Sequence, residues 1–278
     1  MALVPPAPFG VMGIVNLTPD SFYDGWRYAG ASGGIARALS LYGDGADIVD
    51  MGAETTKPGS EALSSEEEQA RLLPVLRALR KVAADMVISV DTYHAATAAA
   101  VLELGAVVVN DVSACAFDPE LTDVLVQYKP GYVLMHHKGR SKTMQDRPQY
   151  DDVRREVMTF FEREMNRLTR AGLPEDRIAL DPGIGFGKTC AHNMELLAHP
   201  GDLLSFGRPV LIALSMKSVF GDLLGLPVEE RDFATQIATA LLWNNGIFWH
   251  RVHDVVATRQ SLTLAAALRS KECENAGD

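Results

Sequence analysis

Cysteine is scarce in this 278-residue sequence, and its placement argues against two classes of protein. The three cysteines, Cys115, Cys190 and Cys273, are odd in number and lie far apart along the chain. This pattern indicates neither a disulfide framework nor a zinc site. So few thiols, with no bridge to form, are typical of a reducing compartment, and we expect a cytoplasmic protein.

Positive charge is also in short supply. The sequence has 26 Lys and Arg residues against 36 Asp and Glu residues, which gives a formal net charge of −10. Such a chain has no broad electrostatic attraction to nucleic acid or to anionic membranes, and we expect neither as a partner. Any phosphate that it binds must be held by a local cluster of cations or by helix N-termini.

Long apolar runs are missing as well. No segment reaches the roughly 18 consecutive apolar residues that a membrane-spanning helix needs. The first eight residues have neither a cationic leader nor an unbroken apolar core, so we expect no signal peptide. The last eight residues, 271–278, are mostly polar, and we expect them to form a disordered tail.

What the sequence does contain is a regular alternation of short β-branched runs and amphipathic stretches. The stretch 72–79 has an apolar stripe at helical spacing, and the last one carries Leu262, Leu264 and Leu268. The predicted strands are Val11–Val15, Asp47–Met51, Met86–Asp91, Val107–Asn110, Tyr132–His136, Ile178–Asp181, Val210–Leu214 and Ile247–Arg251.

This alternation predicts parallel strands joined by helical crossovers. Eight strands favour a closed (β/α)8 TIM barrel, and no linker divides residues 1–278, so we predict a single domain. The alternative is an open Rossmann-like sheet. It is disfavoured because no Gly-x-Gly-x-x-Gly follows the first strand.

Polar residues gather where the predicted strands end. In a barrel these ends meet at the C-terminal mouth, where barrel enzymes place their chemistry. Two connections, residues 16–34 and 52–64, exceed the usual length of βα loops and favour lids over the mouth. The polar positions are Asn16, Glu54 to Lys57, Asp91, Asn110–Asp111, His136–His137, Asp181, Ser215, Lys217, Arg251, His253 and Asp254.

Seven motifs follow the predicted strands in order. They are Met12–Phe22, Gly45–Gly59, Ile88–Thr92, Val109–Val112, Leu180–Lys188, Ser215–Ser218 and Arg251–Asp254. Any one of them would be weak evidence, but their order and their positions at strand ends are specific. Across residues 10–268 the chain resembles the dihydropteroate synthase family of pterin-binding barrels.

The resemblance implies a transferase of folate synthesis. It would condense 6-hydroxymethyl-7,8-dihydropterin pyrophosphate with 4-aminobenzoate to give 7,8-dihydropteroate and pyrophosphate. By resemblance, Asp91, Lys217 and Arg251 are the catalytic residues, and Asp91 helps a cationic pterin methylene. The same resemblance assigns pterin contacts to Asp91, Asn110, Met135, Asp181, Phe186 and Lys217. Gly183, Gly185 and Gly187 suggest that the backbone closely approaches a ligand.

The remaining contacts implied by the resemblance concern the pyrophosphate, the acid and a metal ion. Asn16 would bind Mg²⁺, which retains waters and bridges phosphate oxygens. The family also implies a homodimer through the later helices and a target of sulfonamides. The pyrophosphate contacts are Thr56, Lys57, Arg251 and His253, and the 4-aminobenzoate contacts are Phe22, Pro58 and Ser218.

The sequence departs from the family pattern in the motif Ser215–Ser218. Met216 stands where the family usually has Arg, which removes a cation near the expected acid site. A non-catalytic pterin-binding paralogue is therefore one alternative. A methyltetrahydrofolate-dependent methyltransferase is another, but it would not need the loop Thr18–Phe22, Lys217 or the segment Arg251–His253.

Overall fold

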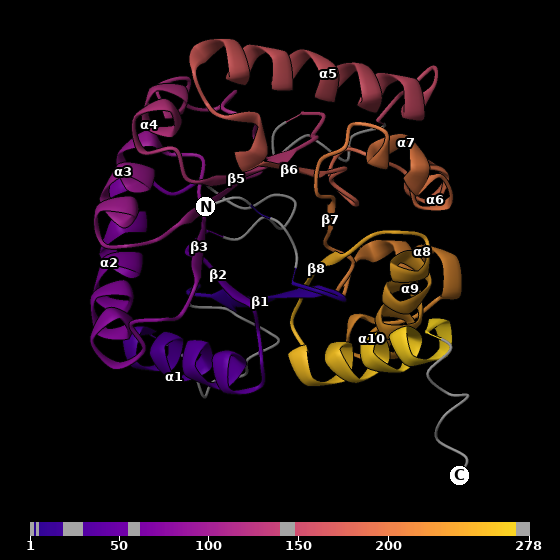
Figure 1. The fold of residues 1–278 in the computed structure, drawn as a ribbon, viewed down its shortest axis with the longest axis horizontal. Helices are drawn as coiled ribbons and strands as arrows, with labels where there is room; N and C mark the ends of the chain where they lie inside the picture. The colour runs from indigo at the N-terminus through magenta and orange to yellow at the C-terminus, as the bar shows by residue number, and fades with distance from the viewer. Residues whose placement is uncertain (1–2, 4–5, 19–29, 55–61, 140–147, 271–278) are drawn as a thin grey trace.

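The computed structural model describes residues 3, 6–18, 30–54, 62–139 and 148–270, and these residues form a (β/α)8 barrel (Figure 1). All eight predicted strands are present and every pairing is parallel. The strands are β1 Gly10–Asn16, β2 Ile48–Gly52, β3 Ile88–Asp91, β4 Val108–Asp111, β5 Gly131–Met135, β6 Ile178–Asp181, β7 Leu211–Ile212 and β8 Trp249–Val252.

The sheet follows the order β6-β5-β4-β3-β2-β1-β8-β7, so β6 and β7 meet at the seam. The seam is closed by a parallel bridge between Leu180 and Val210 and by a 2.8 Å hydrogen bond from Leu180 N to the Pro209 carbonyl. The closed barrel is therefore confirmed over the open sheet. The seventh strand is shorter than predicted, because Val210 contributes only this bridge.

Helices surround the strands on the outside of the barrel, as Figure 1 shows. In α2 the predicted stripe is buried at Leu72, Val75, Leu76 and Leu79. Among the described residues, no helix is both long and apolar enough to cross a membrane. The helices are α1 Gly30–Gly43, α2 Ser65–Val82, α3 Ala95–Glu103, α4 Leu121–Tyr128, α5 Val153–Ala171, α6 Cys190–Ala198, α7 Pro200–Leu204, α8 Ser218–Leu224, α9 Asp232–Asn244 and α10 Val255–Arg269.

The last helix differs from its predicted amphipathic pattern. Leu262 is fully buried, but Leu264 and Leu268 are 62% and 72% exposed. On α9, which contacts α10, Phe233 and Leu241 are likewise 77% and 61% exposed. An exposed apolar surface of this kind is typical of an interface between proteins.

The interior of the barrel is filled in layers, as strand alternation requires. A buried apolar cluster contains Ile48, Val108, Ala179 and Trp249, one from each even-numbered strand. Two residues further along each strand, the next inward positions are polar. These positions form a ring at the carboxyl end of the barrel, which we call the polar ring: Asp50, Asn110, Asp181 and Arg251.

Candidate active site

Arg251 joins the predicted site residues across the mouth. Its Nε donates to Asp50 Oδ2 at 2.7 Å, and its Nη2 donates to Asp91 Oδ2 at 2.9 Å. Asn110 Nδ2 donates to the same Asp50 oxygen at 3.1 Å. The structure therefore brings Asp91, Asn110 and Arg251 together, as predicted. The predicted contact of Arg251 with pyrophosphate would have to use its Nη1 side or displace a carboxylate.

Asp91 lies in an environment that disfavours its charge. Burial raises its pKa to about 7, and the nearby carboxylate of Asp50 acts in the same direction. The guanidinium of Arg251 opposes this shift but does not overcome it. Asp91 is thus a carboxyl group that changes charge near neutral pH, which is typical of active sites.

Asp181 ends β6 and fixes the turn that follows. Its Oδ1 accepts a 2.7 Å hydrogen bond from Gly183 N. Burial raises the pKa of Asp181, and the hydrogen bond from Gly183 opposes that rise. The side chain is 4% exposed, so it is a carboxylate held at the floor of the mouth.

Two of the glycines after Asp181 are required by a close approach within the protein itself. A Cβ on Gly183 would lie 1.9 Å from the His136 carbonyl oxygen, and one on Gly187 would lie 2.2 Å from the Lys138 carbonyl oxygen. Both residues also have positive φ, at 65° and 62°. The close approach is therefore to the protein's own loop after β5.

Lys188 stabilises this glycine-rich loop through a buried side chain. Its Nζ lies 2.9 Å from His136 Nδ1, 3.0 Å from the Gly183 carbonyl and 3.1 Å from the Phe186 carbonyl. The side chain is 3% exposed, and burial lowers its pKa to about 7. Lys188 was not predicted as a site residue, and it fixes the loop that carries Phe186.

Lys217 lies immediately before α8 and faces the same loop. Its Nζ is 4.2 Å from the centroid of the Phe186 ring, a cation–π geometry. Burial lowers its pKa to about 8, although the carboxylate of Asp181 favours the charged form. Ser218 is the first residue of α8 and is exposed.

His253 is held as a neutral ring. Its Nδ1 lies 2.9 Å from Ser215 Oγ, and its carbonyl accepts a 2.7 Å hydrogen bond from Arg37 Nη2. Burial lowers the pKa of His253 to about 3, and the charge of Arg251 adds to this effect. Without a bound anion, His253 therefore offers a hydrogen bond rather than a full charge.

Met216 adopts a left-handed conformation with φ of 62°. Its carbonyl accepts a 3.1 Å hydrogen bond from Arg231 Nη1, and Arg231 Nε donates to the Leu226 carbonyl at 3.1 Å. An arginine from the start of α9 thus lies beside the position where the family usually has one. Arg231 was not among the predicted site residues.

The remaining predicted residues are placed as follows. Asn16 ends β1 and Met135 ends β5, and both residues lie at the carboxyl end of the barrel. Phe22, Thr56, Lys57 and Pro58 lie outside the described residues, as does the predicted tail 271–278.

Asp50 is the site residue that sequence reasoning missed. It is fully buried and binds two predicted site residues through one oxygen. The available signal was its spacing, because it lies two residues after the inward-facing Ile48 in a strand of apolar residues.

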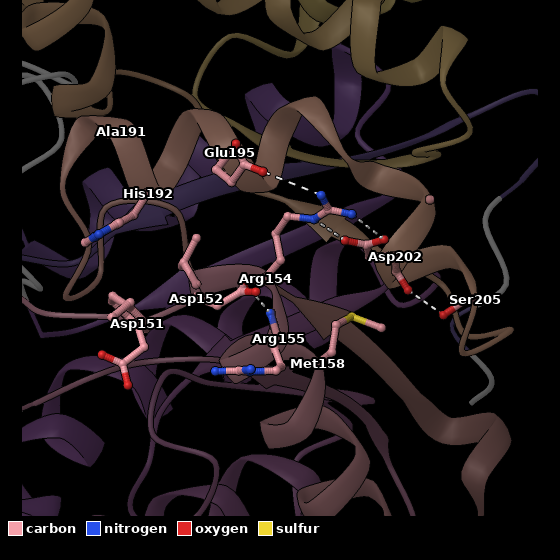
Figure 2. Close-up of a pocket in the computed structure, with 13 residues that line it drawn as sticks. Asp151, Asp152, Arg154, Arg155, Met158, Ala191, His192, Glu195, Asp202 and Ser205 are labelled. Carbon is pink, nitrogen blue, oxygen red and sulfur yellow. Dashed lines mark hydrogen bonds and ion pairs between the residues drawn. The ribbon is translucent and has the colours of Figure 1, made fainter.

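A separate open groove lies on the outer wall, between α5, α6 and α7. Figure 2 shows Arg154 between Glu195 and Asp202, with its Nε donating to Asp202 Oδ2 at 2.6 Å. The residues that line the groove come from these helices and the segment before α5, and no strand contributes. It is therefore distinct from the mouth, and its Arg154 is already paired with Glu195 and Asp202.

The comparisons with known proteins agree with this geometry. A family model described as pterin binding enzyme matches residues 12–253. The dihydropteroate synthase of Synechocystis sp. is 38% identical over 276 residues, which covers 95% of each chain.

Solved structures show the same likeness. The Yersinia pestis dihydropteroate synthase with a sulfonamide drug superposes with a TM-score of 0.90 at 36% identity, covering 94% of both chains. The Xanthomonas albilineans dihydropteroate synthase with 4-aminobenzoic acid gives a TM-score of 0.87 at 39% identity, covering 94% of this chain and 93% of that one. The likeness thus extends over nearly the whole barrel.

Proposed function

The chain belongs to the dihydropteroate synthases of the pterin binding enzyme family, and from this premise we propose that the mouth described above is the active site. The enzyme is a transferase that joins 6-hydroxymethyl-7,8-dihydropterin pyrophosphate to 4-aminobenzoate in folate synthesis. The observation that carries the assignment of the site is the convergence of Asp91, Asn110 and Arg251: Arg251 donates directly to Asp91, and Arg251 and Asn110 share the acceptor oxygen of Asp50.

The pterin ring is held by the residues that line the floor of the mouth. The 2-amino group and N3–H form a paired donor edge that the Asp181 carboxylate accepts. Asn110 and Asp91 bind further ring nitrogens and the amino group, and Lys217 reaches the ring carbonyl and N5. Met135 and Phe186 supply apolar walls.

The pyrophosphate end of the substrate needs cations and N–H donors. Arg251 supplies a charge that is already oriented, and His253 supplies a neutral hydrogen bond. Thr56 and Lys57 are further contacts, on a segment outside the described residues. These groups would stabilise the negative charge that builds up on the leaving pyrophosphate.

Magnesium is the metal that fits this donor set. Asn16 offers a hard amide oxygen at the mouth, and no group of three His, Cys, Asp or Glu residues in the described part of the chain forms a metal cage. Mg²⁺ usually keeps several waters and is held by few protein ligands plus phosphates. When bound, it would neutralise charge on the diphosphate, and Asn16 is the residue that would hold it.

The bond change needs no covalent enzyme intermediate. The bond between the pterin methylene carbon and the pyrophosphate oxygen breaks, and its electron pair leaves with pyrophosphate. The amine nitrogen of 4-aminobenzoate then forms the new bond to carbon and loses one proton. The ionised Asp91 stabilises the positive charge on the methylene, so electrostatics that are fixed in advance provide the catalysis.

The acid substrate lies towards α8. The N-terminus of this helix and the Ser218 hydroxyl suit the carboxylate of 4-aminobenzoate. Phe22 and Pro58 are the proposed ring contacts. Sulfonamides would compete for this same site, and a cytoplasmic location fits the low number of cysteines.

A steady-state assay of pyrophosphate release tests the function. Release that requires both 4-aminobenzoate and Mg²⁺, and that stops when EDTA is added, would support it. Tight pterin binding without turnover would instead indicate the non-catalytic paralogue. Turnover that survives EDTA would contradict only the proposed role of Mg²⁺ and would leave the proposed reaction standing.

The pH dependence of the rate follows from two pKa shifts. Because Asp91 loses its charge below its pKa of about 7, we expect kcat/KM to fall as the pH drops below that value. Because Lys217 loses its charge above its pKa of about 8, we expect a second fall at higher pH. Carboxyl ¹³C NMR of the unliganded protein measures the pKa of Asp91 without any contribution from ionisation of the substrate. The Asp91→Asn variant assigns the signal. A resonance of Asp91 that titrates near pH 4 would refute this explanation.

We also propose a homodimer through the apolar surface of α9 and α10. Phe233, Ile237 and Leu241 form one stripe along α9, and Leu264 and Leu268 extend it on α10, which packs against α9. A self-complementary surface is what a two-fold dimer requires. We expect Phe233→Glu to convert a dimer to a monomer in sedimentation velocity experiments.

The control for this prediction is Val82→Glu. Val82 is 66% exposed at the end of α2, on the other side of the barrel from α9 (Figure 1). It adds the same charge at a similarly exposed apolar position, and the dimer should persist. A monomeric wild-type protein at tens of micromolar would be evidence against the dimer.

A further inference from the structure

We propose that Asp50 is a positioning residue of the condensation, which holds Arg251 and Asn110 in their working orientations. The proposal rests on the function assigned above and adds a residue to its machinery. Asp50 lies in β2, and its oxygen Oδ2 accepts hydrogen bonds from both side chains.

The position of β2 in the barrel makes this double contact possible. In the ring of eight strands, β4 and β8 lie opposite each other, and β2 is two strands from each. Asn110 and Arg251 therefore approach the substrate from opposite sides. A single acceptor between them fixes both side chains relative to each other.

The arrangement extends from Asp50 to Asp91. Arg251 donates Nε to Asp50 and Nη2 to Asp91, so its planar guanidinium is fixed at two points. If Asp50 were removed, the Arg251 side chain would pivot about the bond to Asp91. Arg251, which contacts the pyrophosphate, and Asp91, which stabilises the methylene, would then both lose their alignment.

A purely structural account of Asp50 is the weaker one. Its side chain is fully buried, and its second oxygen, Oδ1, has no hydrogen-bond partner among the described residues. Removing a carboxylate from water is costly, and apolar replacements of buried ion pairs are often neutral or stabilising. A carboxylate retained there at a cost is better explained by the orientation that it imposes on Arg251 and Asn110.

Other charged groups face the same space, and they limit what Asp50 does by charge alone. Asp91 is influenced by Glu68 of α2 and Asp111 of β4 as well as by Asp50, and Arg251 opposes all three. Lys217 and Asp181 also interact with Arg251. Because several carboxylates contribute negative charge, the distinctive contribution of Asp50 is the geometry of its two hydrogen bonds.

Two variants separate geometry from charge. Asp50→Ala removes both hydrogen bonds, and we expect kcat/KM to fall about 100-fold, as misplaced catalytic groups do. Asp50→Asn is nearly isosteric and keeps an acceptor oxygen, so we expect a loss of only about tenfold. Both are compared with the wild-type protein per folded molecule, after circular dichroism and thermal unfolding.

The matched control is Asp47→Asn. Asp47 immediately precedes β2 at the opposite end of the barrel, and its Oδ2 accepts from Val11 N and from Arg259 Nη1. This variant breaks a comparable pairing of Asp with Arg outside the site. We expect its kcat/KM to stay within about twofold of wild type.

A double-mutant cycle shows whether Asp50 acts through Arg251. In an Arg251→Lys background we expect Asp50→Asn to cost less than about threefold, because the partner is already altered. Equal costs in both backgrounds, or wild-type kcat/KM in folded Asp50→Ala, would overturn the proposal while leaving the wild-type activity established. If Asp50→Ala does not fold, Asp50→Asn and the cycle decide the question.

Discussion

Replacement of Lys217 by Met is expected to lower kcat/KM about 10³-fold with little change in the fold. Lys217 Nζ lies over the Phe186 ring and is attracted by the charge of Asp181. Removing a single donor that is fixed in a catalytic site costs about 10²–10³-fold in rate, and the lost cation–π contact adds to this. Met keeps most of the side-chain volume, so the change mainly removes the charge and the hydrogen bonds.

Steady-state kinetics with both substrates would measure this effect, and Lys81→Met is the control. Lys81 lies exposed in the last turn of α2, so its loss should leave kcat/KM unchanged. If Lys217→Met retained more than a tenth of the wild-type kcat/KM, Lys217 would be a pterin neighbour without a catalytic role. A binding measurement with a pterin that lacks the diphosphate shows how much of the loss is in affinity.

The strands of the barrel could be predicted because most are short runs rich in apolar residues, and nearly all of their residues are buried. Seven of the eight follow their predicted bounds closely, and β7 is the exception. At the seam, Leu180 N pairs with the carbonyl of Pro209, and the regular ladder of β7 is limited to Leu211–Ile212. The length of β7 depends on how it pairs with the neighbouring strand. The apolar sequence of β7 does not reveal that pairing.

The pairing within the site could not be predicted in the same way. Arg251 contacts Asp50 over a separation of 201 residues and Asp91 over 160. The sequence placed Arg251 and Asp91 near strand ends, but it passed over Asp50 and did not show which carboxylate faces which cation. It therefore described Arg251 as a phosphate ligand and did not show that Asp50 and Asp91 hold it.

The surroundings of Met216 could not be predicted from the sequence either. This is the position where the chain departs from the family pattern. The sequence has Met216 where the family usually has Arg in the motif Ser215–Ser218, and it does not show which other cation lies near that position. The structure places Arg231 beside Met216, bonded to its carbonyl. A cation from the residue just before α9 is thus close to this turn, and the fold of the chain between α8 and α9 brings it there.

Replacement of Asp181 by Ala is expected to weaken pterin binding about 10³-fold. Asp181 is buried at the floor of the mouth, and its carboxylate is the proposed acceptor for two N–H groups of the ring. Hydrogen bonds to charged groups contribute about 1.5–3 kcal/mol each. The loss of two bonds therefore corresponds to about 10²–10⁴-fold in affinity, since about 1.4 kcal/mol is tenfold.

Isothermal titration with a pterin that lacks the diphosphate measures this effect without any contribution from Arg251 or Mg²⁺. Asp181→Asn separates the two tasks of the side chain, because its amide oxygen still accepts from Gly183 N and its NH2 group faces the donor edge. We expect it to keep the turn and to bind pterin nearly as poorly as Asp181→Ala. Asp176→Asn, exposed just before β6, should bind like wild type. Equal pterin affinity in wild type and Asp181→Asn would show that Asp181 shapes the Gly183 turn and does not recognise the ring.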